Sequence, residues 1–207
     1  MEGGDRIKLA GNLKCSIADV YAAIGNHDNA IKYYDESIED LRKISDRQYL
    51  AIAYNNAGDA LFLNGQYEES LEYFGKAKEV FDKNANKEGI SFYHGNTGMV
   101  YAQMGQHELA EENMNKAITI FEEMKNFYPI SVFLTYIADI YVEKNNKAKA
   151  LNFANRSLDL AQQYSLKNEI SNAHKKLAEI HDYFGNNNKA YHHFREHISM
   201  RDSITDI

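Results

Sequence analysis

The chain has 207 residues, of which 44% are hydrophobic, and its formal net charge at pH 7 is −7. This composition is sufficient for a sizeable core, and the excess of acidic residues argues against binding to the phosphate backbone of nucleic acids. The single cysteine, Cys15, excludes an intrachain disulfide and agrees with a reducing compartment, and there is neither a secretory signal nor a membrane-spanning stretch, so we expect a cytoplasmic protein.

A glycine or asparagine recurs every 40 residues along the chain, at Gly25, Gly65, Gly105, Asn145 and Gly185. A constant period of this length is typical of a solenoid, in which each repeat is one supersecondary unit. Glycine tolerates the left-handed backbone conformation that often ends a helix, and asparagine is the usual second choice. Each of these five markers therefore predicts a tight turn between two helices.

Small and bulky side chains keep fixed distances from the markers. Small residues stand seven before and five after each marker: Ala18, Gly58, Gly98, Ala138 and Ala178, then Ala30, Ser70, Ala110, Ala150 and Ala190. Mostly bulky residues stand four before and nine after: Tyr21, Leu61, Tyr101, Tyr141 and His181, then Tyr34, Phe74, Met114, Ala154 and Phe194. Small residues allow two helix axes to approach and larger ones fill the space beside them, so these positions predict the core.

In chain order, the period predicts five helical hairpins, at approximately residues 7–46, 47–86, 87–126, 127–166 and 167–205. The only proline, Pro129, falls in the first turn of the fourth hairpin, where its missing N–H costs no helical hydrogen bond. No Pro/Gly/Ser-rich linker interrupts the period, so residues 1–207 are predicted to form a single domain of about ten helices.

The segments Tyr54–Lys78 and His94–Ile118 carry the most complete form of this pattern, and it extends over roughly residues 11 to 203. The pattern resembles the tetratricopeptide repeat (TPR). The resemblance implies an all-α fold, a right-handed superhelix or α-solenoid of five hairpins. The period is 40 residues instead of 34, and this longer form is similar to the repeats of kinesin light chain, of spindle-orientation adaptors and of bacterial signalling proteins.

The resemblance also implies that the first helix of every hairpin lines a concave groove that binds a peptide or protein segment. Transferred position by position, it assigns the groove to the first helices of all five hairpins. The predicted groove residues are Asp19, Asn55, Asn56, Asp59, Phe62, Asn96, Met99, Tyr136, Asp139, Glu143, Glu179 and Tyr183.

A carboxylate recurs at one equivalent position, in Asp19, Asp59, Asp139 and Glu179. Repeated acids in a concave wall suit a basic or N-terminally charged peptide, because the wall concentrates the electric field. The alternative is that these acids pair with lysines of neighbouring helices or stay solvated. Both interpretations remain open from the sequence.

Histidine is the residue type that most suggests chemistry, because His193 and His197 share a helical face and His174 and His181 precede them. A zinc site needs three or four converging ligands, so we expect these histidines to be packing residues of an atypical last hairpin. No phosphate loop, GxSxG or HExxH motif is present. We predict no catalytic residue, metal or cofactor, and no enzymatic activity.

The predicted function is therefore that of a protein–protein interaction module. The alternative is a sensory or regulatory N-terminal part of a bacterial histidine kinase, nucleotide or diguanylate cyclase, or DNA-binding regulator. The chain ends without a polar capping helix, so we expect a fragment of a longer protein. A member of the bacterial Rap type is disfavoured because its separate N-terminal helical bundle is missing. We expect no nucleic-acid or membrane partner, and the oligomeric state stays open.

Overall fold

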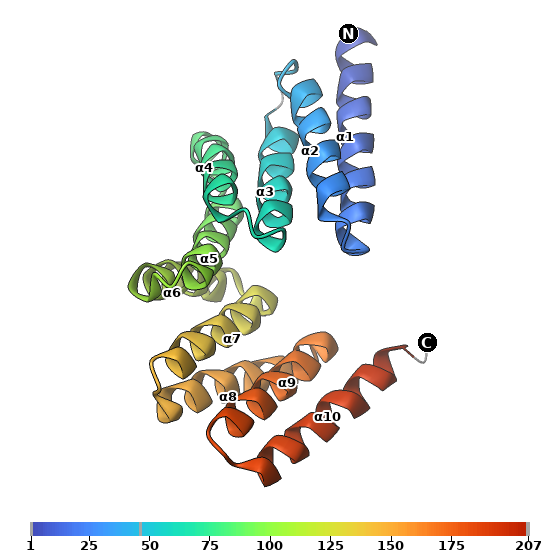
Figure 1. Cartoon of the computed structure of the whole chain (residues 1–207). Helices are drawn as coiled ribbons and strands as arrows, with labels where there is room; N and C mark the ends of the chain where they lie inside the picture. Colours follow the sequence, from blue (N-terminus) through green and yellow to red (C-terminus); the bar gives the residue numbers. More distant parts are fainter. Residues whose placement is uncertain (1, 46, 206–207) are drawn as a thin grey trace. The chain divides into compact units, whose positions relative to one another are not determined.

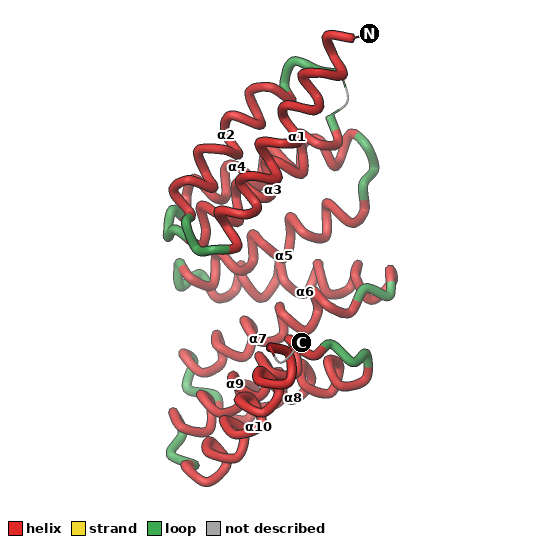
Figure 2. The backbone as a smooth tube through the Cα atoms, turned by 90° about the vertical axis from the view of Figure 1, so that its right-hand side faces the viewer, coloured by secondary structure: helices red, strands yellow, loops and turns green. Residues whose placement is uncertain are grey.

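The computed structural model describes residues 2–45 and 47–205, which form helices and loops only (Figure 2). Residues 1, 46 and 206–207, which the predicted domain and the first predicted hairpin include, lie outside the described part. The helices are α1 (Glu2–Ala23), α2 (His27–Leu41), α3 (Gln48–Leu63), α4 (Tyr67–Lys83), α5 (Lys87–Gln103), α6 (His107–Met124), α7 (Phe127–Glu143), α8 (Lys147–Gln163), α9 (Lys167–Tyr183) and α10 (Asn187–Thr205). The predicted all-α fold with about ten helices is confirmed.

The chain forms two compact units, Met1–Met104 with α1 to α5 and Gly105–Ile207 with α6 to α10. Within each unit, every helix packs against the next one along the chain (Figure 1). The boundary falls between the two helices of the third predicted hairpin, so the single domain stays a prediction. None of the described helices has the length and apolar character needed to cross a bilayer.

The five markers adopt the left-handed conformation that their residue types predict. The four glycines have φ between 72° and 77°, and Asn145 has a φ of 51°. At this asparagine the next residue, Asn146, donates its backbone N–H to the Tyr141 carbonyl oxygen at 2.8 Å, which closes α7. The Asn146 side chain then accepts the backbone N–H of Lys149 at 3.1 Å and caps α8. A two-residue turn thus ends one helix and begins the next.

A second series of left-handed turns lies at the predicted boundaries between hairpins, but the sequence did not indicate their left-handed backbone. Ala85, Lys125 and Ser165 have φ values of 49°, 56° and 55°. These positions share the 40-residue period, but none carries the glycine that makes such a conformation recognisable.

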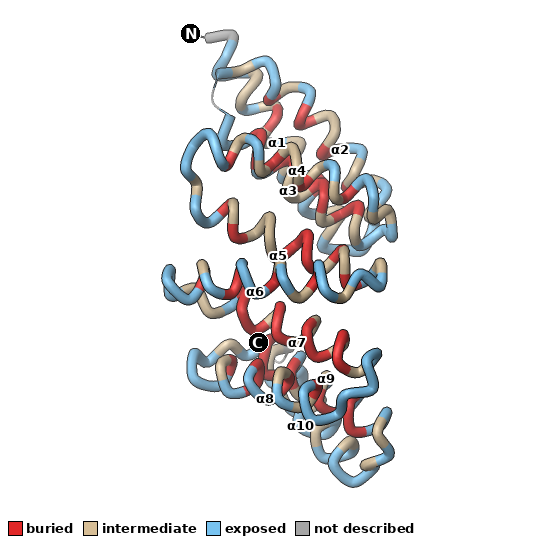
Figure 3. The backbone as a smooth tube through the Cα atoms, turned by 90° about the vertical axis from the view of Figure 1, so that its left-hand side faces the viewer, coloured by how far each residue is buried: buried red, intermediate tan, exposed pale blue. Residues whose placement is uncertain are grey.

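The small positions lie where the two helices of a hairpin meet, which confirms their predicted role. A Cβ atom added to Gly58 would come within 2.6 Å of the buried Phe74 ring. Ser70 keeps its hydroxyl satisfied in this core because it donates to the Gly58 carbonyl oxygen at 2.8 Å. Figure 3 shows buried stretches along α7 and mostly exposed or half-buried backbone along α10. The predicted core position Phe194 on α10 is wrong, because this side chain is 51% exposed.

Candidate functional site

Three helices of the first unit, α1, α3 and α5, contribute to two hydrogen-bonded groups of amides and carboxylates. Asn96 Nδ2 on α5 donates to Asp59 Oδ1 at 2.9 Å and to Asn55 Oδ1 at 3.3 Å. Asn55 Nδ2 donates in turn to Asp59 Oδ2 at 3.3 Å. Asn56 Nδ2 donates to Asp19 Oδ1 on α1 at 3.2 Å. These five predicted residues form what we call the amide–carboxylate network.

Asp59 is the electrostatic centre of the network. Its carboxylate accepts hydrogen bonds from two neutral amides, and no cationic side chain of the described chain pairs with it. Burial raises the pKa of Asp59 to about 7, because removal from water disfavours the charged form. Ionisation of this carboxyl group near neutral pH therefore costs more free energy in the folded chain than it does in water. A cation close to the carboxylate would lower this cost.

Tyr34 and Cys15 complete the surroundings of Asp19. The Tyr34 hydroxyl on α2 donates to Asp19 Oδ1 at 2.6 Å. From the sequence, Tyr34 was predicted only as a core residue. Its hydrogen bond to Asp19 could not be predicted without knowing how α2 packs against α1. Burial raises the pKa of Cys15 to about 12, and Asp19 adds to the shift. The thiol stays protonated at neutral pH and lacks the reactivity of a thiolate nucleophile.

Phe62 and Met99 extend the same helix faces by one turn. Phe62 follows Asp59 by three residues on α3, and Met99 follows Asn96 by three on α5, so each lies beside a network residue. Both are half-buried. The network is thus continued by apolar side chains at its edge.

In the second unit, the predicted acids are paired with basic side chains. Lys176 Nζ on α9 lies 2.8 Å from an Asp139 oxygen on α7 and 2.9 Å from a Glu179 oxygen. Glu143 lies 3.2 Å from His107 Nε2. Burial raises the pKa of Asp139, and Lys176 opposes the shift. At these positions the structure agrees with the alternative that the acids pair with neighbouring helices.

The two predicted tyrosines of the second unit are on the same helices as these ion-paired acids, Tyr136 three residues before Asp139 and Tyr183 four residues after Glu179. Tyr136 is half-buried on α7, and Tyr183 is 61% exposed in the last turn of α9. Close by, α9 and α10 enclose a hollow of about 470 Å³. The residues that line it are Lys175, Ala178, Glu179, Asp182, Asn187, Ala190, Tyr191 and Phe194. Glu179 is the one predicted groove residue among them.

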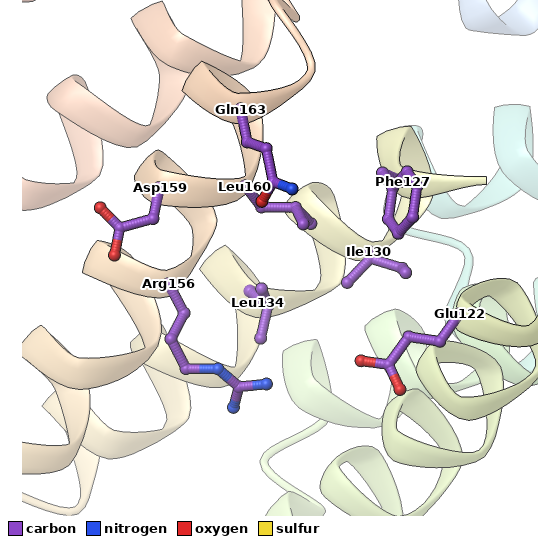
Figure 4. Close-up of a pocket in the computed structure, with 8 residues that line it drawn as sticks. All are labelled: Glu122, Phe127, Ile130, Leu134, Arg156, Asp159, Leu160 and Gln163. Atoms are coloured by element: carbon purple, nitrogen blue, oxygen red, sulfur yellow. The ribbon is translucent and has the colours of Figure 1, made fainter. Parts of the chain in front are cut away.

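A smaller hollow of about 200 Å³ lies among α6, α7 and α8. Figure 4 shows Ile130 and Leu134 of α7 between Glu122 of α6 and Arg156 of α8. Sequence reasoning missed this hollow because α6 and α8 are second helices, which the resemblance places away from the groove.

The histidines of the last hairpin pack against one another. His174 Nδ1 and His193 Nδ1 lie 3.1 Å apart, and the His181 ring stacks on that of His193 with centroids 5.6 Å apart. Within residues 2–45 and 47–205, no group of three or more His, Cys, Asp or Glu side chains has an arrangement that could hold a metal ion.

Comparison with known proteins agrees with this architecture. The family model described as "Tetratricopeptide repeat" matches residues 9–83 and 49–123, which together cover more than half of the chain. The family model described as "Anaphase-promoting complex subunit 5" matches residues 132–206. No curated protein matches the sequence.

Solved structures of low sequence identity share the fold. BtubC (BKLC) from P. vanneervenii has a TM-score of 0.75 at 16% identity, with 98% of this chain and 84% of that chain covered. The Rap conjugation gene regulator of plasmid pLS20, in complex with the Phr* peptide, has a TM-score of 0.84 at 18% identity, with 99% and 57% covered. The putative kinesin light chain TPR-like repeats of Podosopora anserina have a TM-score of 0.70 at 13% identity, with 100% of both chains covered. With its period, its helical hairpins and the matching family model, the chain belongs to the tetratricopeptide repeat family.

Proposed function

We propose that the chain is a non-catalytic interaction module whose first unit binds a protein or peptide segment carrying a positive charge. The observation that supports this most is the amide–carboxylate network, with Asp59 at its centre. The formal net charge of −7 favours a protein partner over a nucleic acid. The single cysteine, Cys15, is free, which is consistent with action in the cytoplasm.

The amides of the network suit a peptide backbone. An asparagine side chain has two donor hydrogens and an acceptor oxygen, and the hydrogen bonds to Asp19 and Asp59 use only part of this capacity. Three asparagines on two neighbouring helices can therefore bind both N–H and C=O groups of an extended or helical segment. Phe62 and Met99 add apolar contact at the edge.

Asp59 selects for a cation. A lysine, an arginine or an N-terminal amine placed against its carboxylate would stabilise the charged form that burial disfavours. The equivalent acid of the second unit, Asp139, already has Lys176 at 2.8 Å, so a ligand cation would have to compete there. This difference is our reason for assigning the site to the first unit.

A regulatory role within a larger protein is a second proposal. What favours it is that this chain spans only 57% of the peptide-bound Rap regulator that shares its fold. In that case the bound segment would act as the signal, by shifting the protein between conformations that bind it unequally.

The proposal is tested by probing an array of peptides of random sequence with the purified chain. We expect bound sequences to be enriched in lysine and arginine, and Asp59→Asn and Asn96→Ala to reduce the signal by about tenfold or more, which corresponds to the loss of about 1.4 kcal/mol. The matched control is Asp139→Asn, which removes an acid already paired with lysine and should bind as the wild type does. Bound peptides without cationic enrichment, or equal binding by Asp59→Asn, would contradict the proposal.

A further inference from the structure

The first helix, α1, carries a long exposed apolar stripe. It consists of Leu9, Leu13, Ile17 and Val20 on α1 and of Ile24 directly after the helix, which are 60%, 56%, 42%, 63% and 70% exposed. Their spacing of three or four residues places them on one face of the helix. Among the described residues no helix covers this face. Apolar surface of this extent on a soluble domain usually marks an interaction site.

The positions equivalent to the three middle residues of the stripe are buried on α3 and α7. On α3, Ala53, Ala57 and Ala60 stand 40 residues after Leu13, Ile17 and Val20, and they are at most 1% exposed. On α7 the same three positions are Phe133, Ile137 and Ile140, at most 2% exposed. The second helix of the preceding hairpin covers them, since α2 packs on α3 and α6 packs on α7. The α1 stripe is thus one half of a joint that recurs within the chain.

The last helix, α10, exposes the other half of this joint. Phe194 is 51% exposed, whereas Phe74 at the same position of α4 is 1% exposed. Both rings have the first helix of their own hairpin beside them, so the difference comes from the helix that follows, which is α5 for Phe74. Tyr191, three residues earlier on α10, is 65% exposed.

We propose that these two faces bind each other between copies, so that α1 of one molecule packs on α10 of a second molecule. The occupant of each face is a second copy of this chain, and the contact continues the joint seen at α2–α3, α4–α5, α6–α7 and α8–α9. Such an interface is head-to-tail, because two different surfaces meet.

The joints inside the chain fix the register of this contact. Tyr141 of α7 donates its hydroxyl to Glu111 of α6 at 2.8 Å. The position equivalent to Tyr141, three repeats earlier on α1, is Tyr21, and the position equivalent to Glu111, two repeats later on α10, is Tyr191. In the proposed contact the half-buried Tyr21 ring of one copy therefore meets the exposed Tyr191 ring of the other. An aromatic pair adds about 0.5 to 1.5 kcal/mol beyond the area that it buries.

The same comparison places a charged residue, Arg201, in the contact between copies. Arg201 of α10 stands where α4 has Phe81, which lies against Gly89 of α5. Gly89 is equivalent to Leu9 of α1, two repeats earlier. In the contact between copies, Arg201 would therefore lie over Leu9 of the second copy, one helical turn from the exposed Asp5. The aliphatic part of an arginine covers apolar surface while its guanidinium remains at the edge, on the side of this carboxylate.

A symmetric pair of α1 helices would cover the stripe but would leave Phe194 and Tyr191 exposed. The two arrangements are distinguished by one variant on each face, Ile17→Glu on α1 and Phe194→Glu on α10. Both side chains are already exposed, so neither change disturbs the core, and circular dichroism checks that the helices are retained. The control is Leu109→Glu, which places the same charge on a 43% exposed leucine outside both faces.

The measurement is the molar mass of the 207-residue chain by sedimentation velocity at increasing protein concentration. We expect the wild type and Leu109→Glu to associate, and each face variant alone to remain monomeric. An equal mixture of the two face variants should form a one-to-one dimer, because each supplies the face that the other lacks. A second pair, Val20→Lys and Tyr191→Lys, should behave in the same way.

Three outcomes would overturn the proposal. A wild-type chain that stays monomeric at all concentrations would leave both faces to other partners. Association lost in Ile17→Glu but retained in Phe194→Glu would indicate the symmetric α1 pair. Association retained in both variants would place the contact elsewhere. None of these outcomes depends on peptide binding in the first unit.

Discussion

At the scale of single residues, Asp59 occupies a position that costs the folded chain stability when its carboxyl group is ionised. Two asparagine amides hold its carboxylate, but amides do not supply the positive charge that would offset its burial. A buried acid without a cation lowers the stability of the folded state whenever it is ionised. Sites that sacrifice stability in this way are commonly the ones that act on a ligand.

This view predicts that Asp59→Asn stabilises the chain in a pH-dependent manner. Burial raises the pKa of Asp59 from 3.8 to about 7, so the folded state binds more protons than the unfolded state between these values. Stability is therefore lost as the pH rises through this window. We expect the variant to gain on the order of 2 kcal/mol in the free energy of unfolding at pH 8, and progressively less as the pH is lowered to 4.

Urea unfolding of both proteins across this pH range measures the difference. Asp139→Asn is the control, and it should gain less stability at pH 8, because Lys176 opposes the effect of burial on the pKa of Asp139. An equal gain for Asp59→Asn at pH 8 and pH 4 would show that the effect does not come from the titration of this carboxyl group.

At the scale of helices, the hairpins hold together through close approach at small residues, and two glycines provide a matched test. A Cβ atom at Gly58 of α3 would meet the buried Phe74 ring at 2.6 Å, whereas one at Gly75 of α4 meets nothing within 4 Å. We expect Gly58→Ala to lose about 1 to 3 kcal/mol of stability through overpacking. Gly75→Ala should gain about 0.5 to 1 kcal/mol from helix propensity. Thermal unfolding that gives the same sign for both would contradict this account of the hairpin core.

The last hairpin is predicted to loosen in acid because its histidines are packed together. Burial lowers the pKa of His193 to about 4, with His174, His181, His192 and Lys189 adding to the shift. A histidine whose pKa is lowered on folding contributes stability above its unfolded value near 6.5, and this contribution is lost as the pH falls toward 4. After allowance for its partial exposure to solvent, the loss is roughly 1 kcal/mol.

Hydrogen exchange measures this effect locally. Between pH 6.5 and 4, and after correction for intrinsic exchange rates, we expect α10 to lose protection more than α7 does. His193→Phe keeps a ring at this position but cannot take up a proton, so it should remove most of the difference. Retained acid sensitivity in this variant would assign the loss to other groups.

At the scale of the whole molecule, the helices could be predicted because the same local rules recur every 40 residues. The turn residue, which is glycine or Asn145, and the small residues at fixed distances from it lie within about ten residues of one another. The helical hairpins can therefore be recognised in a single sequence. Ala85 and Ser165 adopt the same left-handed backbone without a residue type that marks it, so the conformation of these turns was not predicted, although the period placed hairpin boundaries beside them.

The candidate site was only partly predictable, since its chemistry depends on contacts between hairpins. The positions of Asp59 and Asp139 are equivalent in sequence, and nothing local distinguishes them. In the structure Asp139 meets Lys176 from 37 residues away, whereas Asp59 meets Asn96 from the same separation. The residue at one position of the following hairpin, Asn96 or Lys176, thus decides whether the acid meets a neutral amide or a cation.

The central claim is that Asp59 is a half-buried carboxylate that binds a cation of the partner, and titration of its side-chain carboxyl carbon by NMR tests it most directly. The measurement is made on the chain alone and on the chain saturated with a lysine-containing peptide selected from the array. We predict a pKa near 7 for the free chain, as burial requires, and a fall of at least about one pKa unit in the complex, since a bound cation favours the charged form. A free-chain pKa close to 4, or one that saturation with the peptide leaves unchanged, would contradict the account.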